Sequence, residues 1–421
     1  MTFTSVPGST SWRMLSPGGA PLPLSAIARG VLRFRDGVAL IDAFRDVLSS
    51  RFGSRYVFFT GSGRAALSFL FTAFRKLAPE RNEVLIPAYA SFTVPSAVVH
   101  AGCRISLYDV DSKTLAPCYE SLDNALSERT LAVVACHQFG FPFATERMAS
   151  MCRQAGAFFV DDAAQAMGGM VGKQLAGTMG DAGIFSLSRG KPMTTIEGGV
   201  VLCNEPAIAE SLRSILPQAG CAGLPLLQLI KAAGLSVLRN PWLYRLPASV
   251  PWLRLGASIF DPDFEEGCFS AFQASLGIQA LAFLDRVNWE RNRKADIYCR
   301  ALQGQPGLAL VPAQADSRPV CLRFPILSEI LRKNFSEIPA VRSRVIALGI
   351  SRGFPLSLDA IPALRRHIAS SSESGYSGAH YLAENLFTLP THEYVRETDC
   401  NRVADCVTEL VSTGAAKEKA V

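Results

Sequence analysis

An acidic pair and a lysine about thirty residues later are the side chains of this sequence best suited to chemistry. Asp161 and Asp162 end the apolar run 158–162, and Lys191 follows a second apolar run in a turn of small residues. A buried parallel strand brings its last residue to the sheet edge where ligands bind. A lysine held in a loop beside a buried carboxylate is a candidate amine nucleophile. The sequence therefore predicts Lys191 and Asp162 as catalytic residues.

Pyridoxal phosphate is a cofactor that needs such a pair. Its chemistry requires an amine for a Schiff base and an acid that faces the pyridinium nitrogen. The alternative for Lys191 is the solvated surface role that most lysines have. No Cys-x-x-Cys pair with a histidine partner is present, so no metal ligands are predicted.

Three motifs around these residues resemble the DegT/DnrJ/StrS family of aminotransferases, which act on nucleotide-linked keto-sugars and relatives. The motifs are Asp-x-x-Gln-Ala at 162–166, Gly-Asp-x-x-x-Phe-Ser at 180–186 and Lys-x-x-Thr-x-x-Glu-Gly-Gly at 191–199. Each motif alone is weak, but their order and separation match the family. The resemblance implies an α/β protein of PLP-dependent transferase fold type I. Such a protein has a mostly parallel central sheet with helices on both faces and a smaller C-terminal α+β domain.

The resemblance also implies roles for single residues. Lys191 would form the Schiff base and then move a proton between the donor α-carbon and the cofactor, while Asp162 stays ionised against the ring nitrogen. Gln165 would contact the ring-oxygen side, Ser186 would hold the phosphate, and Glu197 would orient the lysine loop. The implied reaction transfers an amino group from an amino acid, glutamate by expectation, to a keto or aldehyde acceptor. A nucleotide-linked sugar is favoured as acceptor by analogy only.

Two other functions stay open at this point. One is a different pyridoxal phosphate reaction, such as elimination, decarboxylation or condensation, on an apolar or lipid-like substrate. The other is a non-catalytic protein that binds pyridoxal phosphate, in which departures from the family pattern have ended turnover.

A glycine-containing turn between a strand and a helix predicts a phosphate seat. The strand covers 56–60, and Ser62 and Gly63 lie in the turn before the helix. Free amides at the start of a helix attract anions, so Ser62, Gly63 and the amides up to Ala65 are assigned to the cofactor phosphate. Family members have threonine where this chain has Arg64, which either contacts the phosphate or projects to solvent.

The aromatic side chain that stacks on the cofactor is not obvious in this chain. The family position falls on Ser91, with Tyr89 and Phe92 on either side. Phe92 is the first choice and Tyr89 the second, and packing in the core is the alternative for both. His137 begins a turn similar to one in the family, and we expect it to fix that turn rather than to serve chemistry.

Alternating strand and helix patterns from 56 to 205 predict the mostly parallel sheet. We expect a large domain over 1–262, with an apolar insertion at about 215–260, and a small domain over 263–421. One long helix from Ser270 through Tyr298 is predicted to open the small domain. Family members carry Asn-x-Arg just upstream and reach the partner subunit's cofactor with it. Residues 265–269 lack that motif, so only the homodimer itself is carried over as an expectation.

Composition limits the remaining functions. The 421 residues are 49% hydrophobic and 19% charged, which suggests a large oligomer interface or a membrane-facing surface. The net charge of +6 is mild and no basic run is present, so nucleic acid is not a predicted partner. The chain begins without a signal-peptide pattern, and no apolar run reaches the roughly 20 residues of a membrane span. The eleven cysteines are expected to be buried free thiols in a reducing cytoplasm.

The interval between Glu210 and Asp261 contains no acidic residue. Its apolar segments within 224–255 carry tryptophans and only basic charges, which is typical of an element that lies on a membrane surface. The alternatives are an apolar insertion that covers a dimer seam and one that lines a pocket for an acyl-type substrate.

Overall fold

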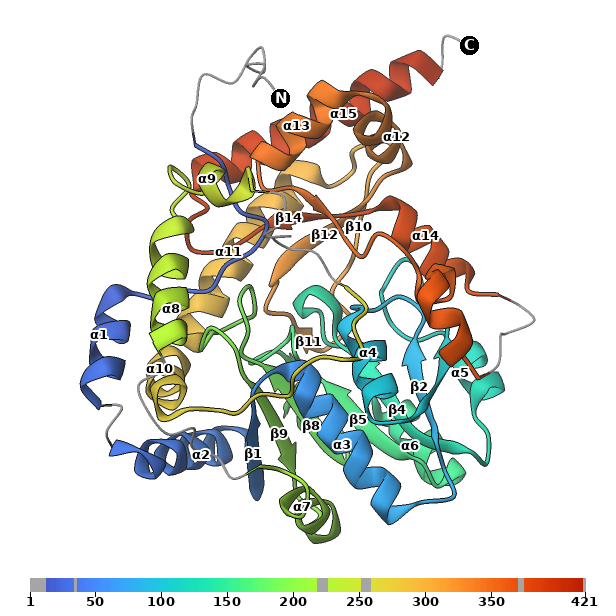
Figure 1. Cartoon of the computed structure of the whole chain (residues 1–421). Coiled ribbons are helices and arrows are strands. Elements are labelled where there is room, and N and C mark those ends of the chain that lie inside the picture. The colour runs from blue at the N-terminus through green and yellow to red at the C-terminus, as the bar shows by residue number, and fades with distance from the viewer. Residues whose placement is uncertain (1–12, 34–35, 218–225, 251–258, 370–374, 419–421) are drawn as a thin grey trace.

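A seven-stranded sheet forms the centre of the larger part of the molecule (Figure 1). The computed structural model describes residues 13–33, 36–217, 226–250, 259–369 and 375–418. Strand β9 runs antiparallel to both of its neighbours, and the other neighbouring strands are parallel. The predicted mostly parallel sheet is thereby confirmed. In spatial order the strands are β1 (Tyr56–Thr60), β9 (Gly199–Cys203), β8 (Ala182–Ser186), β5 (Phe158–Asp162), β4 (Thr130–Cys136), β2 (Glu83–Pro87) and β3 (Arg104–Tyr108).

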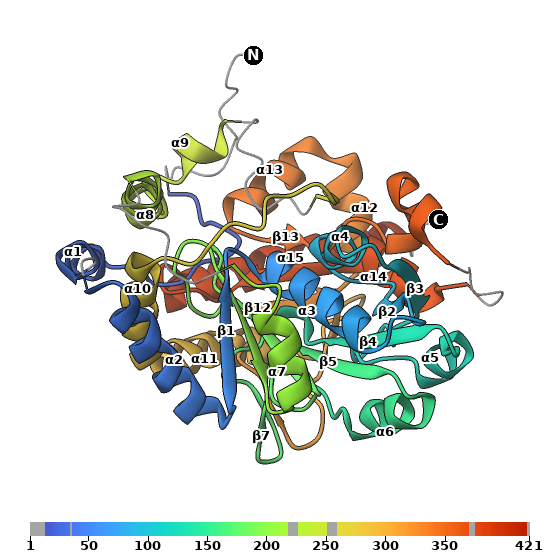
Figure 2. The same ribbon diagram turned by 60° about the horizontal axis from the view of Figure 1, so that its bottom comes forward.

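Helices cover both faces of this sheet because successive strand residues point to opposite sides. In β9, Val201 packs in the cluster that contains helix α3, whereas Val200 packs in the cluster that contains helix α2. Figure 2 shows α3 and α2 apart from each other across β1. The helices of this part are α2 (Val38–Phe52), α3 (Gly63–Leu77), α4 (Thr93–His100), α5 (Tyr119–Ala125), α6 (Glu146–Ala155) and α7 (Pro206–Arg213).

A second, antiparallel sheet with its own helices forms the C-terminal part, as predicted. Its spatial strand order is β10 (Ala309–Leu310), β12 (Arg323–Leu327), β14 (Leu386–Pro390) and β13 (Ser351–Arg352). The helices around it are α11 (Leu284–Leu302), α12 (Glu329–Glu337), α13 (Pro339–Ala347), α14 (Ser377–Asn385) and α15 (Glu397–Glu418). Short helical turns lie at Leu358–Ala360 and Pro362–His367.

The prediction of a single long helix from Ser270 through Tyr298 is wrong, because the helix is interrupted at Phe283. Helix α10 (Ala271–Ala282) packs against α1 (Leu24–Arg33) and α2, whereas α11 packs against α15. Because the buried faces of the two helices pack against different partners, the chain changes direction between α10 and α11. The buried Leu281 and Leu284 flank the break, and Phe283 itself is exposed.

Several contacts join the two parts of the chain. Strand β11 (Ser317–Arg318) pairs with β6 (Met170–Val171), which also pairs with β7 (Gln174–Leu175). The stretch 13–22 runs against the C-terminal part, where Leu15 donates its amide to Ala347 and Ser16 accepts from His392. Residues 1–12 lie outside the described residues.

The buried ring of His392, which contacts Ser16, makes the stability of the native state depend on pH. Its Nε2 donates to the Ser16 carbonyl at 2.8 Å and its Nδ1 accepts from the Tyr394 amide at 3.3 Å. Burial lowers the pKa of His392 from 6.5 to about 3, aided by the charges of Arg239, Lys294 and Arg291. Below pH 6.5 the unfolded chain therefore binds a proton that the native chain does not bind.

We expect the native state to lose stability as the pH falls from 6.5 towards 3. The share of His392 alone is about 2 kcal/mol at pH 5. Urea denaturation at pH 7 and pH 5 measures it, with the variant His392→Asn as comparison. A variant that loses as much stability as the wild type over this interval would contradict the prediction.

The apolar insertion is described over 226–250, and the ends of the predicted surface segment 224–255 lie outside the described residues. It forms α8 (Leu226–Leu238) and the short α9 (Arg245–Ala248). Both views show α8 beside α1 (Figures 1 and 2), and the two helices are in contact. Among the described residues no helix is long and apolar enough to cross a membrane.

The cysteine prediction holds for most positions. Nine cysteines of the described residues are free. Cys268 is disulfide-bonded, so the expectation of a free thiol is wrong at this position.

Candidate active and cofactor site

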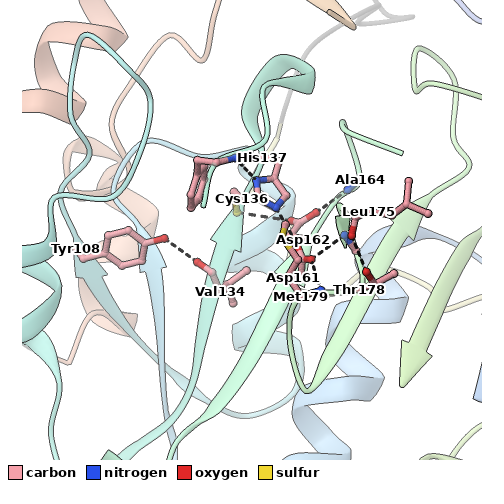
Figure 3. Close-up of polar contacts among 12 residues, drawn as sticks. Tyr108, Val134, Cys136, His137, Asp161, Asp162, Ala164, Leu175, Thr178 and Met179 are labelled. Carbon is pink, nitrogen blue, oxygen red and sulfur yellow. Dashed lines mark hydrogen bonds and ion pairs between the residues drawn. The ribbon is translucent and has the colours of Figure 1, made fainter. Parts of the chain in front are cut away.

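The two aspartates at the end of β5 have different surroundings (Figure 3). Asp161 is fully buried and faces the ring of His137, 2.8 Å away. Its second oxygen accepts from the amides of Gly177 and Met179 at 2.7 and 2.9 Å. All of this hydrogen bonding ties neighbouring turns together. Asp161 and His137 therefore have structural partners, in agreement with the structural role expected for His137.

Asp162 keeps one carboxylate oxygen almost free of protein partners. Oδ1 accepts from the Ala164 amide at 2.9 Å, whereas among the described residues Oδ2 accepts only from the Cys136 thiol at 3.6 Å (Figure 3). Burial raises the pKa of Asp162, and the Ala164 amide and the Lys191 charge oppose this rise. This oxygen can accept a hydrogen bond from a donor such as the N–H of a positively charged pyridinium ring.

The Lys191 amine lies near this carboxylate, and its surroundings disfavour the protonated form of the amine. Burial lowers the pKa of Lys191 and the charge of Arg323 lowers it further, while the charge of Asp162 raises it. Among the described residues the Nζ atom has no hydrogen-bond partner. A lowered pKa and an uncommitted amine are what a nucleophilic lysine needs.

Arg291 holds the main chain of the lysine turn and was not predicted as a site residue. Its side chain is completely buried, and its Nη atoms donate to the carbonyls of Pro192, Lys191 and Gly19. Burial lowers the pKa of Arg291 to about 10. The sequence spacing could have indicated that Arg291 is buried, because it lies on the same face of α11 as the buried Leu284, Ala295 and Tyr298.

The far end of the lysine loop is fixed by the insertion helix. Glu197 forms an ion pair with Lys231 of α8 at 2.7 Å, and its carbonyl accepts from Gln273 of α10 at the same distance. Ile196 has a φ of 78°, a left-handed backbone that costs a β-branched residue about 1–3 kcal/mol. Its completely buried side chain packs in one cluster with Ala232 of α8. Packing by the insertion thus offsets the strain in this loop.

The predicted phosphate seat brings Ser62, Gly63 and Ser186 together. Ser62 caps α3 by accepting from the Ala65 amide at 3.0 Å, so that amide is already used. Gly63 lies against Ser186, whose Oγ is 3.0 Å from that of Ser188. A cradle of small side chains around the free amides at the start of a helix fits a phosphate group.

Replacing Gly63 by alanine is expected to damage this seat. The added Cβ would lie 2.7 Å from the Ser186 Cβ and 2.9 Å from its Oγ, so Ser186 would have to move. We expect pyridoxal phosphate to bind about tenfold or more weakly, as a loss of over 1 kcal/mol implies. Fluorescence titration of the apo-protein measures this affinity, and Ala73→Gly on the same helix is the control. An unchanged affinity would show that the phosphate lies elsewhere.

Arg64 has partners within the protein, and its contact with the cofactor phosphate stays a prediction. Its guanidinium is 3.2 Å from a carboxylate oxygen of Asp261 and stacks 4.1 Å from the ring centroid of Phe264. The carbonyl of Pro262 is 2.7 Å from the ring of His100. The segment 261–267 therefore packs over the start of α3 within the same chain.

The other predicted site residues have the following surroundings. Gln165 accepts from the Phe139 amide at 3.1 Å and so supports the turn Gln138–Gly140. Tyr89 lies in the core, where its hydroxyl accepts from the Phe354 amide and burial raises its pKa. Phe92 is buried at the start of α4. Cofactor contact for all three stays a prediction. Among the described residues, no group of three or more His, Cys, Asp or Glu could hold a metal ion.

The sheet, the lysine loop and the acid at the end of β5 define a pyridoxal phosphate enzyme of fold type I. The residues fit the cofactor: Asp162 offers an oxygen to the ring nitrogen, Lys191 an uncommitted amine, and the Gly63–Ser186 cradle a seat for phosphate.

Comparison with known proteins identifies the family. A model of the DegT/DnrJ/EryC1/StrS aminotransferase family matches residues 34–234 and 265–408. The chain belongs to this family, whose members depend on pyridoxal phosphate, and is an aminotransferase. It is 25% identical over 349 residues to a dTDP-4-dehydro-2,3,6-trideoxy-D-glucose 4-aminotransferase of Saccharopolyspora spinosa, covering 83% of each chain.

Solved structures share the fold. Helicobacter pylori PseC, an aminotransferase involved in pseudoaminic acid biosynthesis, has a TM-score of 0.76 at 15% identity, covering 95% of this chain and all of PseC. DesI, solved in the presence of its TDP-sugar product, has a TM-score of 0.75 at 20% identity, covering 98% and 97%.

Proposed function

We propose that this protein transfers the amino group of glutamate to the keto group of a nucleotide-linked sugar. The observation that supports the proposal is a buried Lys191 amine near enough to Asp162 for the carboxylate charge to raise its pKa, while Oδ2 of that carboxylate has only a long thiol contact among the described residues. The acceptor class rests on similarity to the S. spinosa dTDP-sugar aminotransferase. Elimination, decarboxylation or condensation on an apolar substrate has no comparable support.

The residues of the chain divide the work as follows. Pyridoxal phosphate, when bound, supplies an electron sink for the carbanion left when the donor loses its α-proton. Lys191 Nζ accepts that α-proton, and its lowered pKa keeps a fraction of the amine neutral for this purpose. Asp162 Oδ2 would hold the ring N–H, and Ser186 and the Gly63 amide would hold the phosphate. Arg291 fixes the main chain of the lysine turn by donating N–H groups to the carbonyls of Pro192 and Lys191.

A half-reaction tests the function. Purified protein supplied with pyridoxal phosphate should be yellow, and L-glutamate should remove the colour and release 2-oxoglutarate. Subsequent addition of candidate keto-sugar nucleotides or acyl-linked ketones, with amine product as readout, separates the acceptor classes. A protein that stays colourless with pyridoxal phosphate would refute the proposal.

We also propose that the working form is a cytoplasmic homodimer. Sedimentation of the purified protein tests the dimer. The membrane contact predicted through 224–255 is favoured by one observation: Leu226, Leu227, Ile230, Trp242 and Leu246 are all exposed on the described part of the insertion. Flotation with anionic liposomes tests that contact, and protein that does not float with them would contradict it.

A further inference from the structure

Cys136 lies beside the acid of the site and has no role in the proposed function so far. It is the last residue of β4 and is paired in register with Asp162, the last residue of the parallel strand β5. Paired residues of neighbouring strands point to the same face of a sheet, so the two side chains lie side by side. The Cys136 Sγ is 3.6 Å from Asp162 Oδ2, and each residue is only 7% exposed (Figure 3). Water therefore competes little for this contact.

The thiol and one amide hold the two oxygens of the Asp162 carboxylate. Oδ1 accepts from the Ala164 amide, and among the described residues Oδ2 accepts only from the Cys136 thiol. A carboxylate oxygen has two acceptor positions, so Oδ2 keeps one for the ring N–H of pyridoxal phosphate. The thiol can thus fix the orientation of the carboxylate without taking the place of the cofactor.

The other titratable groups around Asp162 do not replace the thiol as a donor. His137 faces the neighbouring aspartate through Nε2, and the Tyr108 hydroxyl donates to a main-chain carbonyl of β4. The Lys191 charge acts on both the carboxylate and the thiol, which places the amine near both groups. That amine is needed for the chemistry. The thiol is therefore the donor that stays with Oδ2 throughout.

The surroundings keep the thiol protonated. Burial raises the pKa of the Cys136 thiol well above its usual value, and the charge of Asp162 raises it further. Donation of a hydrogen bond to an ionised carboxylate stabilises the ionised form. The thiol thereby opposes the rise that burial causes in the pKa of Asp162. A negative acid is what keeps the cofactor ring protonated and able to act as an electron sink.

We propose that Cys136 is a positioning residue whose thiol donates to Asp162 Oδ2, orients the carboxylate before the cofactor binds and keeps it ionised. This inference rests on the proposed function and adds a residue that acts through Asp162 without touching the substrate. The alternative is a cysteine that only fills the core. Serine and alanine at this position both leave unfilled volume, but only serine keeps a hydrogen-bond donor. The two variants therefore separate the alternatives.

The first experiment measures the affinity of the apo-protein for pyridoxal phosphate as a function of pH, by fluorescence titration. It compares the wild type with Cys136→Ala, Cys136→Ser and the control Cys203→Ala, which changes a buried cysteine of β9 at the end of the sheet away from Ser186. The affinity falls where Asp162 takes up a proton, so the acid limb of the profile follows the pKa of Asp162. Titration of the cofactor's own groups is common to all four proteins and cancels in the comparison.

We expect Cys136→Ala to move the acid limb to higher pH by about one unit, as loss of a donor to a charged acceptor implies. Cys136→Ser and Cys203→Ala should keep the limb of the wild type. An unchanged limb in Cys136→Ala would overturn the inference. An equal shift in Cys136→Ser would also overturn it, because that result would follow from lost packing alone.

The second experiment needs no cysteine variant and no cofactor. Infrared spectra of the full-length apo-proteins, wild type and Asp162→Asn, are subtracted in the region of the S–H stretch, where few other protein groups absorb. We expect one S–H band to shift towards the position of a free thiol, because the thiol loses its charged acceptor. A difference spectrum without such a shift would overturn the inference.

The two proposals fail in different ways. A protein that is yellow and reacts with glutamate but shows neither shift would lose this inference and keep the proposed function. A wild type that never takes up pyridoxal phosphate would overturn both together.

Discussion

The Lys191→Ala variant is expected to lose the visible absorption of the cofactor and to lower turnover by more than about 10⁴-fold. The reason is that one amine has two tasks, covalent attachment of the cofactor and transfer of the donor α-proton, and general acid–base transfer alone contributes up to about 10⁴-fold. The lowered pKa of Lys191 and its lack of a described hydrogen-bond partner set it apart from a surface lysine. Absorption spectra and the glutamate half-reaction measure both losses.

The matched control is Lys173→Ala, which removes an exposed lysine between β6 and β7. This variant should keep the colour and the rate of the wild type. Thermal unfolding of both variants separates a chemical loss from a folding defect. Colour and turnover retained in Lys191→Ala would contradict the assignment of the nucleophile, and with it the reading of the whole motif from 191 to 199.

Local patterns were sufficient to predict most strands of the large sheet. The runs 56–60 and 158–162 are rich in aromatic and β-branched residues, and both strands have these limits in the structure. The pattern carries no information about strand direction, so the antiparallel run of β9 between β1 and β8 could not be predicted from it. The direction of a strand depends on the path that the long connections between strands take across the sheet.

The parts of the site that could not be predicted depend on partners distant in sequence. Arg64 finds Asp261 across 197 positions, and the prediction considered only phosphate and solvent. Arg291 reaches the Lys191 carbonyl across 100 positions, and a completely buried arginine is uncommon. Arg323 begins a short strand, where a charged residue usually points to solvent. Motif spacing therefore predicted candidate cofactor contacts and a role for Glu197 in the lysine loop, but not distant partners such as Asp261 and Arg291.

The second large effect is expected from Asp162→Asn, compared with Asp161→Asn at the adjacent position. Asp162→Asn keeps the shape and an oxygen for the Ala164 amide but removes the negative charge that faces the ring nitrogen. We expect kcat to fall by about 10²–10³-fold, the loss typical of one preorganised electrostatic partner. The melting temperature should change little, because burial already disfavours the charged form and raises the pKa of Asp162.

Asp161→Asn should show the opposite pattern. One carboxylate oxygen accepts from the Gly177 and Met179 amides, and the other faces His137. The NH₂ group of an asparagine would replace one of these oxygens and place a hydrogen-bond donor opposite another donor. Removal of such a buried charged acceptor costs about 3–5 kcal/mol of stability. The protein that remains folded should keep a kcat closer to that of the wild type. Since the two side chains are neighbours on one strand, comparing kcat with melting temperature for both variants separates the chemical acid from the structural one. A larger kcat loss in Asp161→Asn than in Asp162→Asn would reverse the assignment.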